Sequence, residues 1–256
     1  MNSRSSSTQP LLPGSYYHIY NRANGFHNLF FKKENYRYFL EKYARYTNQY
    51  IDTFAYCLLP NHFHFLIRPK TTPVILNVAM KDYSSPPKRL VDSTYKYITQ
   101  TSCQIKRADF EFDNFTAVHH FPEDVISRIA AFLAAEQLRK LFMSYSKAVN
   151  KQMNRRGSLF QKYFRRKMVN DNEYLTWLVW YIHRNPLHHQ IALDFRNYRW
   201  SSYQSLITDK PTQLERQEVY SWFGGTKSGF MDFHERAALD FPGFGNLESL
   251  EPLEED

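Results

Sequence analysis

Residues 61–67, with the sequence NHFHFLI, constrain the fold more than any other part of the chain. Successive side chains of a β-strand point to opposite faces of the sheet. A strand here would therefore have two different faces, with His62, His64 and Leu66 on one and Phe63, Phe65 and Ile67 on the other. The phenylalanine face can pack against helices. The other face presents two imidazoles at a spacing typical of metal sites, although a pair of surface or hydrogen-bonded histidines is the alternative.

Hydrophobic periodicity predicts the elements around this strand, which itself extends over residues 62–68. Strands are expected at residues 16–20, 51–59 and 158–169 (the last strand or hairpin), and helices at 34–50, 125–149 and 171–185. Asp171 or Asn172 would cap the last helix and Pro186 would close it. The order strand–helix–strand–strand–helix–strand predicts an α+β fold, a ferredoxin-like (split βαβ) sandwich with an antiparallel sheet.

The pattern also suggests how the chain is divided. We expect a flexible N-terminus at residues 1–14, which lacks the apolar core of a signal peptide, and a main domain at 15–206. Within it, residues 71–124 have weak periodicity and are interpreted as a variable insertion with some local structure. Residues 207–256 would form a less regular C-terminal appendage that ends in an acidic tail, including Glu248, Glu251, Glu254, Glu255 and Asp256.

Charge and aromatic content favour a nucleic-acid partner. The formal net charge is +8, the pI is about 9.3 and 17% of residues are aromatic, so cations for phosphates and rings for unpaired bases are both abundant. Residues 151–170 concentrate this character, with seven Lys or Arg, no acidic residue and Tyr163 among the interleaved rings. A basic enzyme with a solvated basic face is the alternative. Two cysteines are too few for a disulfide framework, and no apolar run approaches the ~20 residues of a membrane span.

A second candidate feature is the helix segment at residues 177–186. At 3.6 residues per turn Tyr181 and Asn185 are neighbours on one helix face. The Asn185 amide oxygen could then be a third metal ligand, with the Tyr181 hydroxyl one turn away. The default interpretation of Tyr181 is an aromatic at the edge of the core, because the chain contains 19 tyrosines.

These blocks together resemble a known group of proteins. The chain has YHIYNRAN at residues 17–24, AYCLLPNHFHFLI at 55–67, RRGSLFQKYF at 155–164, YIHRNP at 181–186 and WSSY at 200–203. The same motifs in the same order are found in the HUH single-tyrosine transposases, especially the REP-associated tyrosine transposases of bacteria. The resemblance covers about residues 16–70 and 138–206, and leaves the insertion and the C-terminal appendage without matching motifs.

The resemblance implies an HUH endonuclease-like fold and roles for particular residues. His62 and His64 would be ligands of Mg²⁺ or Mn²⁺, Tyr181 the nucleophile, and Asn185 the ligand where insertion-sequence relatives carry Gln. The expected reaction is nicking and strand transfer of single-stranded, hairpin-bearing repeat DNA through a covalent 5′-phosphotyrosine. The DNA-binding residues would be Arg22, Arg155, Arg156, Lys162, Tyr163, Arg165, Arg166 and Lys167.

The resemblance further implies a cytoplasmic, nucleoid-associated bacterial protein, with a monomer favoured and a dimer possible. Two other hypotheses stay open at this point. The fold could be a non-catalytic module that holds hairpin DNA or RNA, which would bind without nicking. It could also be a metal-dependent hydrolase that uses His62 and His64 with water as nucleophile, which would release product without a protein–DNA adduct.

Overall fold

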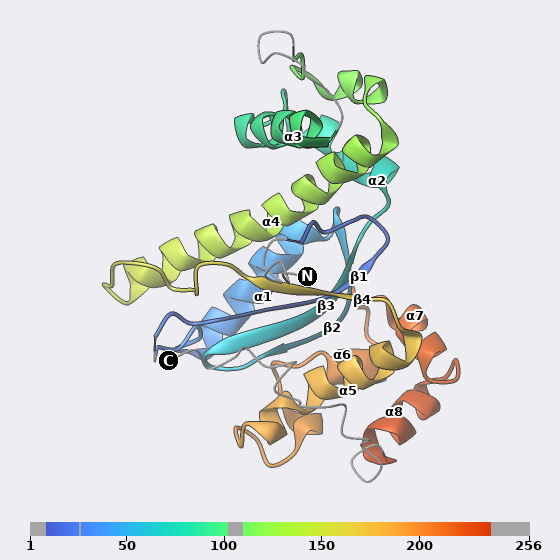
Figure 1. Ribbon diagram of the computed structural model, residues 1–256. Coiled ribbons are helices and arrows are strands. Elements are labelled where there is room, and N and C mark those ends of the chain that lie inside the picture. Colours follow the sequence, from blue (N-terminus) through green and yellow to red (C-terminus); the bar gives the residue numbers. More distant parts are fainter. Residues whose placement is uncertain (1–8, 26, 102–109, 237–256) are drawn as a thin grey trace.

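A four-stranded antiparallel sheet in the order β2–β3–β1–β4 forms the centre of the protein (Figure 1). The computed structural model describes residues 9–25, 27–101 and 110–236. The strands are β1 (Tyr16–Arg22), β2 (Ile51–Leu58), β3 (His62–Pro69) and β4 (Arg165–Val169). Helix α1 (Lys33–Thr47) joins β1 to β2, and α4 (Glu123–Gln152) precedes β4. This connectivity and strand order are those of a split βαβ, ferredoxin-like sandwich, so the predicted fold class is confirmed.

The two faces of β3 pack as the alternation predicts. Phe63 contacts Phe39 of α1 and Phe142 of α4, and belongs to a large apolar core between these helices and the sheet. Leu66 belongs to a second core on the opposite face, together with Leu178 of helix α5 (Asn172–His188). The sheet is therefore covered on both sides, with α1 and α4 on one face and α5 on the other (Figure 1).

Helix α5 begins as predicted but ends differently. The Asp171 side chain accepts a hydrogen bond from the backbone N–H of Glu173, so the expected N-cap is present. Pro186 lies inside the helix, which continues to His188, so the prediction that it closes the helix is wrong. A proline inside a helix lacks its own N–H and crowds the carbonyl four residues earlier, so it disturbs the turn before it. The turn after it is intact, because the backbone N–H of His189 still reaches the Asn185 carbonyl at 2.9 Å. The helix thus keeps its last turn.

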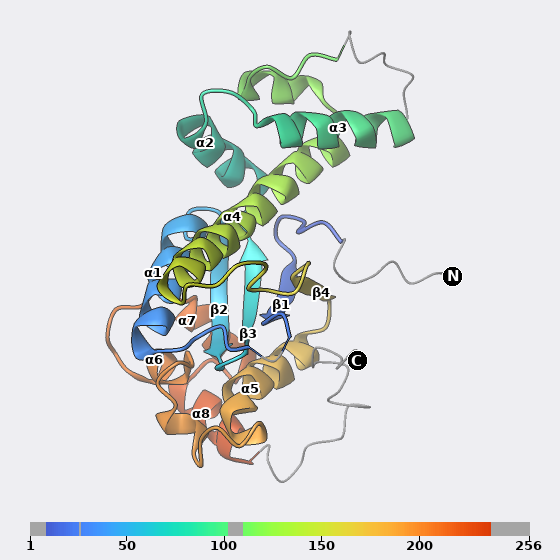
Figure 2. The ribbon, with the colours of Figure 1, turned by 90° about the vertical axis from the view of Figure 1, so that its left-hand side faces the viewer.

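The insertion between β3 and α4 contains more helix than its sequence suggests. Helices α2 (Thr72–Asp82) and α3 (Lys88–Thr101) and the 3₁₀-helix η3 (Phe115–His120) occupy most of it. Both α-helices pack on α4, and Leu90 and Ile98 of α3 are buried. Figure 2 shows α2 and α3 beside the end of α4 that lies away from the sheet. The insertion therefore extends the α4 side of the molecule.

The predicted C-terminal appendage, residues 207–256, is also more regular than expected over the residues that the structure describes. It contains α7 (Arg216–Trp222) and α8 (Lys227–Arg236), and α6 (Tyr203–Ile207) lies at its start. Buried side chains of these three helices join the core on the α5 side of the sheet. The predicted acidic tail lies outside the described residues. Among the described helices, none has the length and apolar character that crossing a membrane would require.

Candidate active site

The two histidines of β3 are held in a rigid part of the sheet. His62 is 5% exposed and His64 is fully buried. The turn before them is fixed by backbone hydrogen bonds, because the Asn61 carbonyl accepts from Ala23 at 2.7 Å and the Pro60 carbonyl accepts from Leu29 at 2.7 Å. Both imidazoles project from the sheet face that α5 covers. The predicted sharing of one strand face is thus confirmed.

Helix α5 brings the other two predicted residues to the same place. The Tyr181 ring lies edge-on to the His64 ring, with centroids 5.6 Å apart and an interplanar angle of 86°. Asn185 is fully buried one turn later, and its amide nitrogen donates to the Tyr181 carbonyl at 2.9 Å. Its side-chain oxygen accepts no hydrogen bond from the described residues. The structure therefore gathers His62, His64, Tyr181 and Asn185 between β3 and α5.

Hydrogen bonds select the tautomer of His62. Its Nδ1 lies 2.7 Å from the side-chain oxygen of Asn61, which can only accept. Nδ1 therefore carries the proton, and Nε2 keeps a lone pair. His64 has a comparable partner, because its Nδ1 lies 2.9 Å from Nε2 of His18 on β1. When His64 donates in this pair, its Nε2 also keeps its lone pair. A histidine that binds a metal is typically oriented in this way, by a hydrogen bond from its other ring nitrogen.

The lone pairs of the cluster are buried and unused. Within the described part of the chain, His62 Nε2, His64 Nε2 and Asn185 Oδ1 have no hydrogen-bond partner. A buried polar atom without a partner costs about 1–3 kcal/mol, so three of them in one place need an explanation. Two neutral nitrogens and an amide oxygen suit a divalent cation such as Mn²⁺ or Mg²⁺. This donor set fits the metal that the resemblance implies.

The set differs from the more common protein metal sites. No group of three or more His, Cys, Asp or Glu side chains positioned to hold a metal occurs among residues 9–25, 27–101 and 110–236. The candidate site has only two such ligands, and the third donor is an amide. It brings no negative charge, so a bound cation would keep its full charge toward an anionic substrate.

Burial keeps these histidines neutral. It lowers the pKa of His62 to about 3, with smaller contributions from the charges of His189 and Arg22, while a side-chain interaction with Asn185 raises it. Burial also holds the pKa of His64 well below its usual value. Imidazole binds metals in its neutral form, so both side chains are ready as ligands at neutral pH.

Two histidines that sequence reasoning missed complete the cluster. His18 pairs in register with Leu66 on β3, which makes it a diagonal neighbour of His64 on the same face. His189 follows α5, and its ring centroid is 4.7 Å from that of His62. The alternation of β1 could have placed His18 on this face once the β1–β3 register was known. We call His18, His62, His64, Tyr181, Asn185 and His189 the β3–α5 cluster.

The predicted DNA-binding residues are divided between the two sides of the sheet. Arg22 pairs in register with His62, and Arg165 and Lys167 of β4 pair with Tyr20 and His18. These three cations therefore lie on the side of the β3–α5 cluster. Burial lowers the pKa of His18 to about 3, and the positive charge of Lys167 adds a smaller contribution in the same direction.

The remaining predicted DNA-binding residues lie elsewhere. Arg166 faces the α4 side and stacks on Phe164, with the guanidinium carbon 4.5 Å from the ring centroid. Lys162 and Tyr163 line a groove on that same side. Arg155 and Arg156 are in the turn after α4. The structure does not bring the eight residues into one patch.

The fold and the cluster define a class of protein: a ferredoxin-like sandwich with buried histidines on a central strand, facing a tyrosine and an asparagine on the helix after β4. The chain is similar to a solved structure described as a REP-associated tyrosine transposase bound to a REP hairpin. The two share 13% sequence identity over 82% of this chain and 89% of that chain, with a TM-score of 0.46. That structure belongs to the group that the sequence motifs resemble. No family model matches the chain, and no curated protein matches it.

Proposed function

We propose that this protein is a metal-dependent strand transferase that cuts and rejoins single-stranded DNA through a covalent 5′-phosphotyrosine. The observation that carries the proposal is the β3–α5 cluster itself. Two neutral imidazoles and an amide oxygen direct unused lone pairs into a buried site, and the Tyr181 ring packs against one of those imidazoles. Three such atoms gathered in one place favour a ligand-binding role over a purely structural one.

His62, His64 and Asn185 would hold the metal. A divalent cation bound there would offset the negative charge that makes a phosphodiester resist nucleophiles. Asn61 and His18 would support the ligands, because their hydrogen bonds to the two Nδ1 atoms fix the orientation of both rings. Arg22, Arg165 and Lys167, on the same side of the sheet, would attract the DNA backbone.

Tyr181 would supply the nucleophile. Attack of its hydroxyl oxygen on the scissile phosphorus forms the P–O bond to the phenol and breaks the bond to the 3′-oxygen. The phenolic proton is, in balance, delivered to the released 3′-hydroxyl. The phosphotyrosine keeps the energy of the phosphodiester, so attack by another 3′-hydroxyl reverses the step and joins a strand without a nucleotide cofactor.

Substrate access requires a movement that uncovers Tyr181. This residue is only 3% exposed, so a DNA phosphate reaches its hydroxyl only after such a change. Movements of this kind are common steps of enzyme reactions. The same burial favours the second candidate function, a module that binds DNA without cutting it, because a tyrosine that stays buried would be unused while the basic residues remained accessible.

The decisive experiment is an adduct assay with Mn²⁺ and single-stranded, hairpin-bearing DNA labelled on the 3′ side of the break. The intact protein should give a labelled protein band on a denaturing gel. Tyr181→Phe should abolish the band and retain DNA binding, whereas Tyr46→Phe on α1, at the opposite face of the sheet, should keep it. Binding without any adduct would favour the module, and nicking without adduct would favour hydrolysis by water.

We also propose that the protein acts as a monomer, since all members of the β3–α5 cluster come from one chain. Mixing Tyr181→Phe with His64→Ala tests this. Two inactive variants should stay inactive when mixed, whereas recovery of the adduct would reveal sites shared between two chains.

A further inference from the structure

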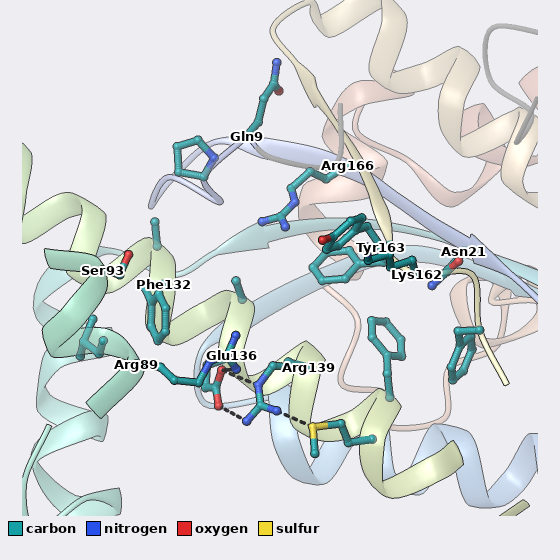
Figure 3. Close-up of a pocket in the computed structure, with 18 of the residues that line it drawn as sticks. Gln9, Asn21, Arg89, Ser93, Phe132, Glu136, Arg139, Lys162, Tyr163 and Arg166 are labelled. Carbon is teal, nitrogen blue, oxygen red and sulfur yellow. Dashed lines mark hydrogen bonds and ion pairs between the residues drawn. The ribbon is translucent and has the colours of Figure 1, made fainter. Parts of the chain in front are cut away.

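A groove of about 940 Å³ lies on the α4 side of the sheet, away from the β3–α5 cluster. One wall is formed by α3 of the insertion and the floor by α4. The other wall is the segment at residues 158–166, which leads into β4. Figure 3 shows Arg89 and Ser93 on one side and Lys162, Tyr163 and Arg166 on the other. Its size is at the upper end of the ~300–1,000 Å³ typical of ligand pockets.

The lining of the groove is strongly cationic. It contains six cations, Arg89, Arg128, Arg139, Lys147, Lys162 and Arg166, and Glu136 is the one carboxylate among the described residues that line it. Glu136 is already engaged, because it accepts from Arg139 at 2.7 Å and from Arg89 at 3.3 Å. Among the described lining residues, cations therefore outnumber carboxylates by six to one. This excess of positive charge favours an anionic ligand over a neutral or cationic one.

The groove also presents flat rings beside these cations. Tyr163 is 60% exposed, so its ring is accessible to a ligand. Phe132 and Phe142 of α4 are partly buried and also line the groove. Cations that contact phosphates, combined with aromatic faces on which bases stack, are the two components of single-strand binding surfaces. The bases of a duplex are already stacked on one another and could not use these rings.

Strand β4 connects the groove to the β3–α5 cluster. It is an edge strand, and its side chains alternate, so Arg166 lines the groove while Arg165 and Lys167 lie on the cluster side. A nucleic-acid backbone that crosses this edge would meet cations on both faces. The two regions can thus contact one continuous strand.

We propose that the groove binds a single-stranded stretch of nucleic acid that is continuous with the phosphodiester held at the β3–α5 cluster. The inference rests on the proposed function for the identity of the polymer and adds a second contact region, built partly by the insertion. Residues 72–101 would therefore set how much flanking single strand the protein engages.

Fluorescence anisotropy with a labelled single-stranded oligonucleotide, without metal, tests the groove separately from catalysis. The variant Arg128→Gln/Lys147→Gln removes two exposed groove cations. The matched control, Arg45→Gln/Lys210→Gln, removes two exposed cations that are not among the described residues lining the groove. The groove variant should bind at least tenfold more weakly at low salt. The slope of log K against log[salt], where K is the association constant, should be shallower by about 1.4, since each lost phosphate contact removes about 0.7 from this slope. Thermal unfolding checks that both variants are folded.

Each outcome decides the proposal. Binding by the groove variant with the affinity and salt slope of the control would overturn it, even if the Tyr181 adduct forms. Failure of the adduct with normal groove binding would instead overturn the proposed function. A duplex of the same length that competes equally well would contradict the single-strand assignment. Photocrosslinking with 5-iodouracil in the oligonucleotide should label Tyr163, and labelling confined to the α5 side would contradict the groove.

Discussion

Two buried histidine clusters lie on the same side of the sheet, and both involve α5, yet their hydrogen bonding is opposite. In the first, which we call the His183 network, His234 donates from Nδ1 to the Phe230 carbonyl at 2.8 Å, so its Nε2 accepts from His183 at 2.9 Å. His183 in turn accepts from Ser202 at 2.8 Å, and Ser202 accepts from the Tyr56 N–H at 2.8 Å. Every ring nitrogen of this network has a partner.

The β3–α5 cluster contains histidines that are just as buried, but its lone pairs are left over. Of the side chains in the described ranges, His62 Nε2 and His64 Nε2 are among the buried atoms that have no partner. The His183 network contributes to stability because it ties α5 to β2 and α8. The unpaired buried atoms of the β3–α5 cluster are unfavourable for stability, which is typical of a site that binds a ligand.

The largest expected effect is a difference in stability when the same substitution, histidine to leucine, is made in each of the two clusters. His183→Leu would strand Ser202 Oγ and His234 Nε2, and should destabilise the fold by about 2–5 kcal/mol, which lowers Tm by about 4–20 °C. His62→Leu removes an unpaired nitrogen, leaves only the partly exposed Asn61 oxygen, and should change stability by less than about 1 kcal/mol. Thermal unfolding in EDTA measures both. Equal losses would mean that the β3–α5 cluster is structural too.

Metal should act on one cluster only. At a Mn²⁺ concentration about 100 times its Kd, the folded protein should gain about 2.7 kcal/mol over its state in EDTA. The gain should survive in a His234→Gln variant and vanish in His62→Leu. A Tm that rises with Mn²⁺ in His62→Leu would place the ion elsewhere, and calorimetric titration gives the stoichiometry directly.

The contrast between the clusters also shows what could be predicted from sequence. The alternation of residues 62–67 and the spacing of Tyr181 and Asn185 follow from local periodicity, so the fold class, the face of the histidine pair and the shared helix face of Tyr181 and Asn185 could be predicted. The meeting of these two pairs was implied by the family resemblance, because periodicity does not say which helix packs on which strand. Neither His18 nor His189 could be identified, because their places depend on the β1–β3 register and on the chain path after α5.

Two further features were missed, one for a local reason and one because it depends on distant packing. Pro186 is a helix-ending signal, but the N–H groups after it find acceptors within the last turn, and α5 continues. The groove could not be predicted from sequence for two reasons. Its wall α3 belongs to a segment of weak periodicity, and successive basic side chains of β4, which lies within residues 151–170, point to opposite faces of the sheet. Composition predicted the positive charge of this stretch but not the face of the sheet on which each cation lies.

The dependence of folding stability on pH should arise partly from the His183 network. Burial lowers the pKa of His234 to about 3, whereas in the unfolded chain it returns to about 6.5. Between these values the unfolded state binds the proton and the folded state does not, so stability is fully present above pH 6.5 and falls as the pH decreases. Each such group contributes about 1.4 kcal/mol per pH unit. His234→Gln should reduce the slope of stability against pH by that amount between pH 6 and 4, as measured by urea unfolding. An unchanged slope would show that His234 does not titrate on unfolding.

The smallest expected effect concerns the tautomer of His62. Asn61→Ala removes the acceptor that holds the proton on Nδ1, so part of the population would place it on Nε2 and block the lone pair. Loss of such a supporting hydrogen bond typically costs 10–100-fold in metal affinity, and the lower value, about tenfold, is expected because Asn61 is partly exposed to water. Asn61→Asp keeps an acceptor at the same position and should bind Mn²⁺ at least as tightly as the unaltered protein. Calorimetric titration of both variants separates the role of the side chain from that of the turn, because the Asn61 backbone carbonyl still accepts from Ala23 in each. Equal affinities for the Ala and Asp variants would mean that the lone pair of His62 is directed by α5 rather than by the turn before β3, and the contrast with the hydrogen-bonded His183 network would then rest on His64 alone.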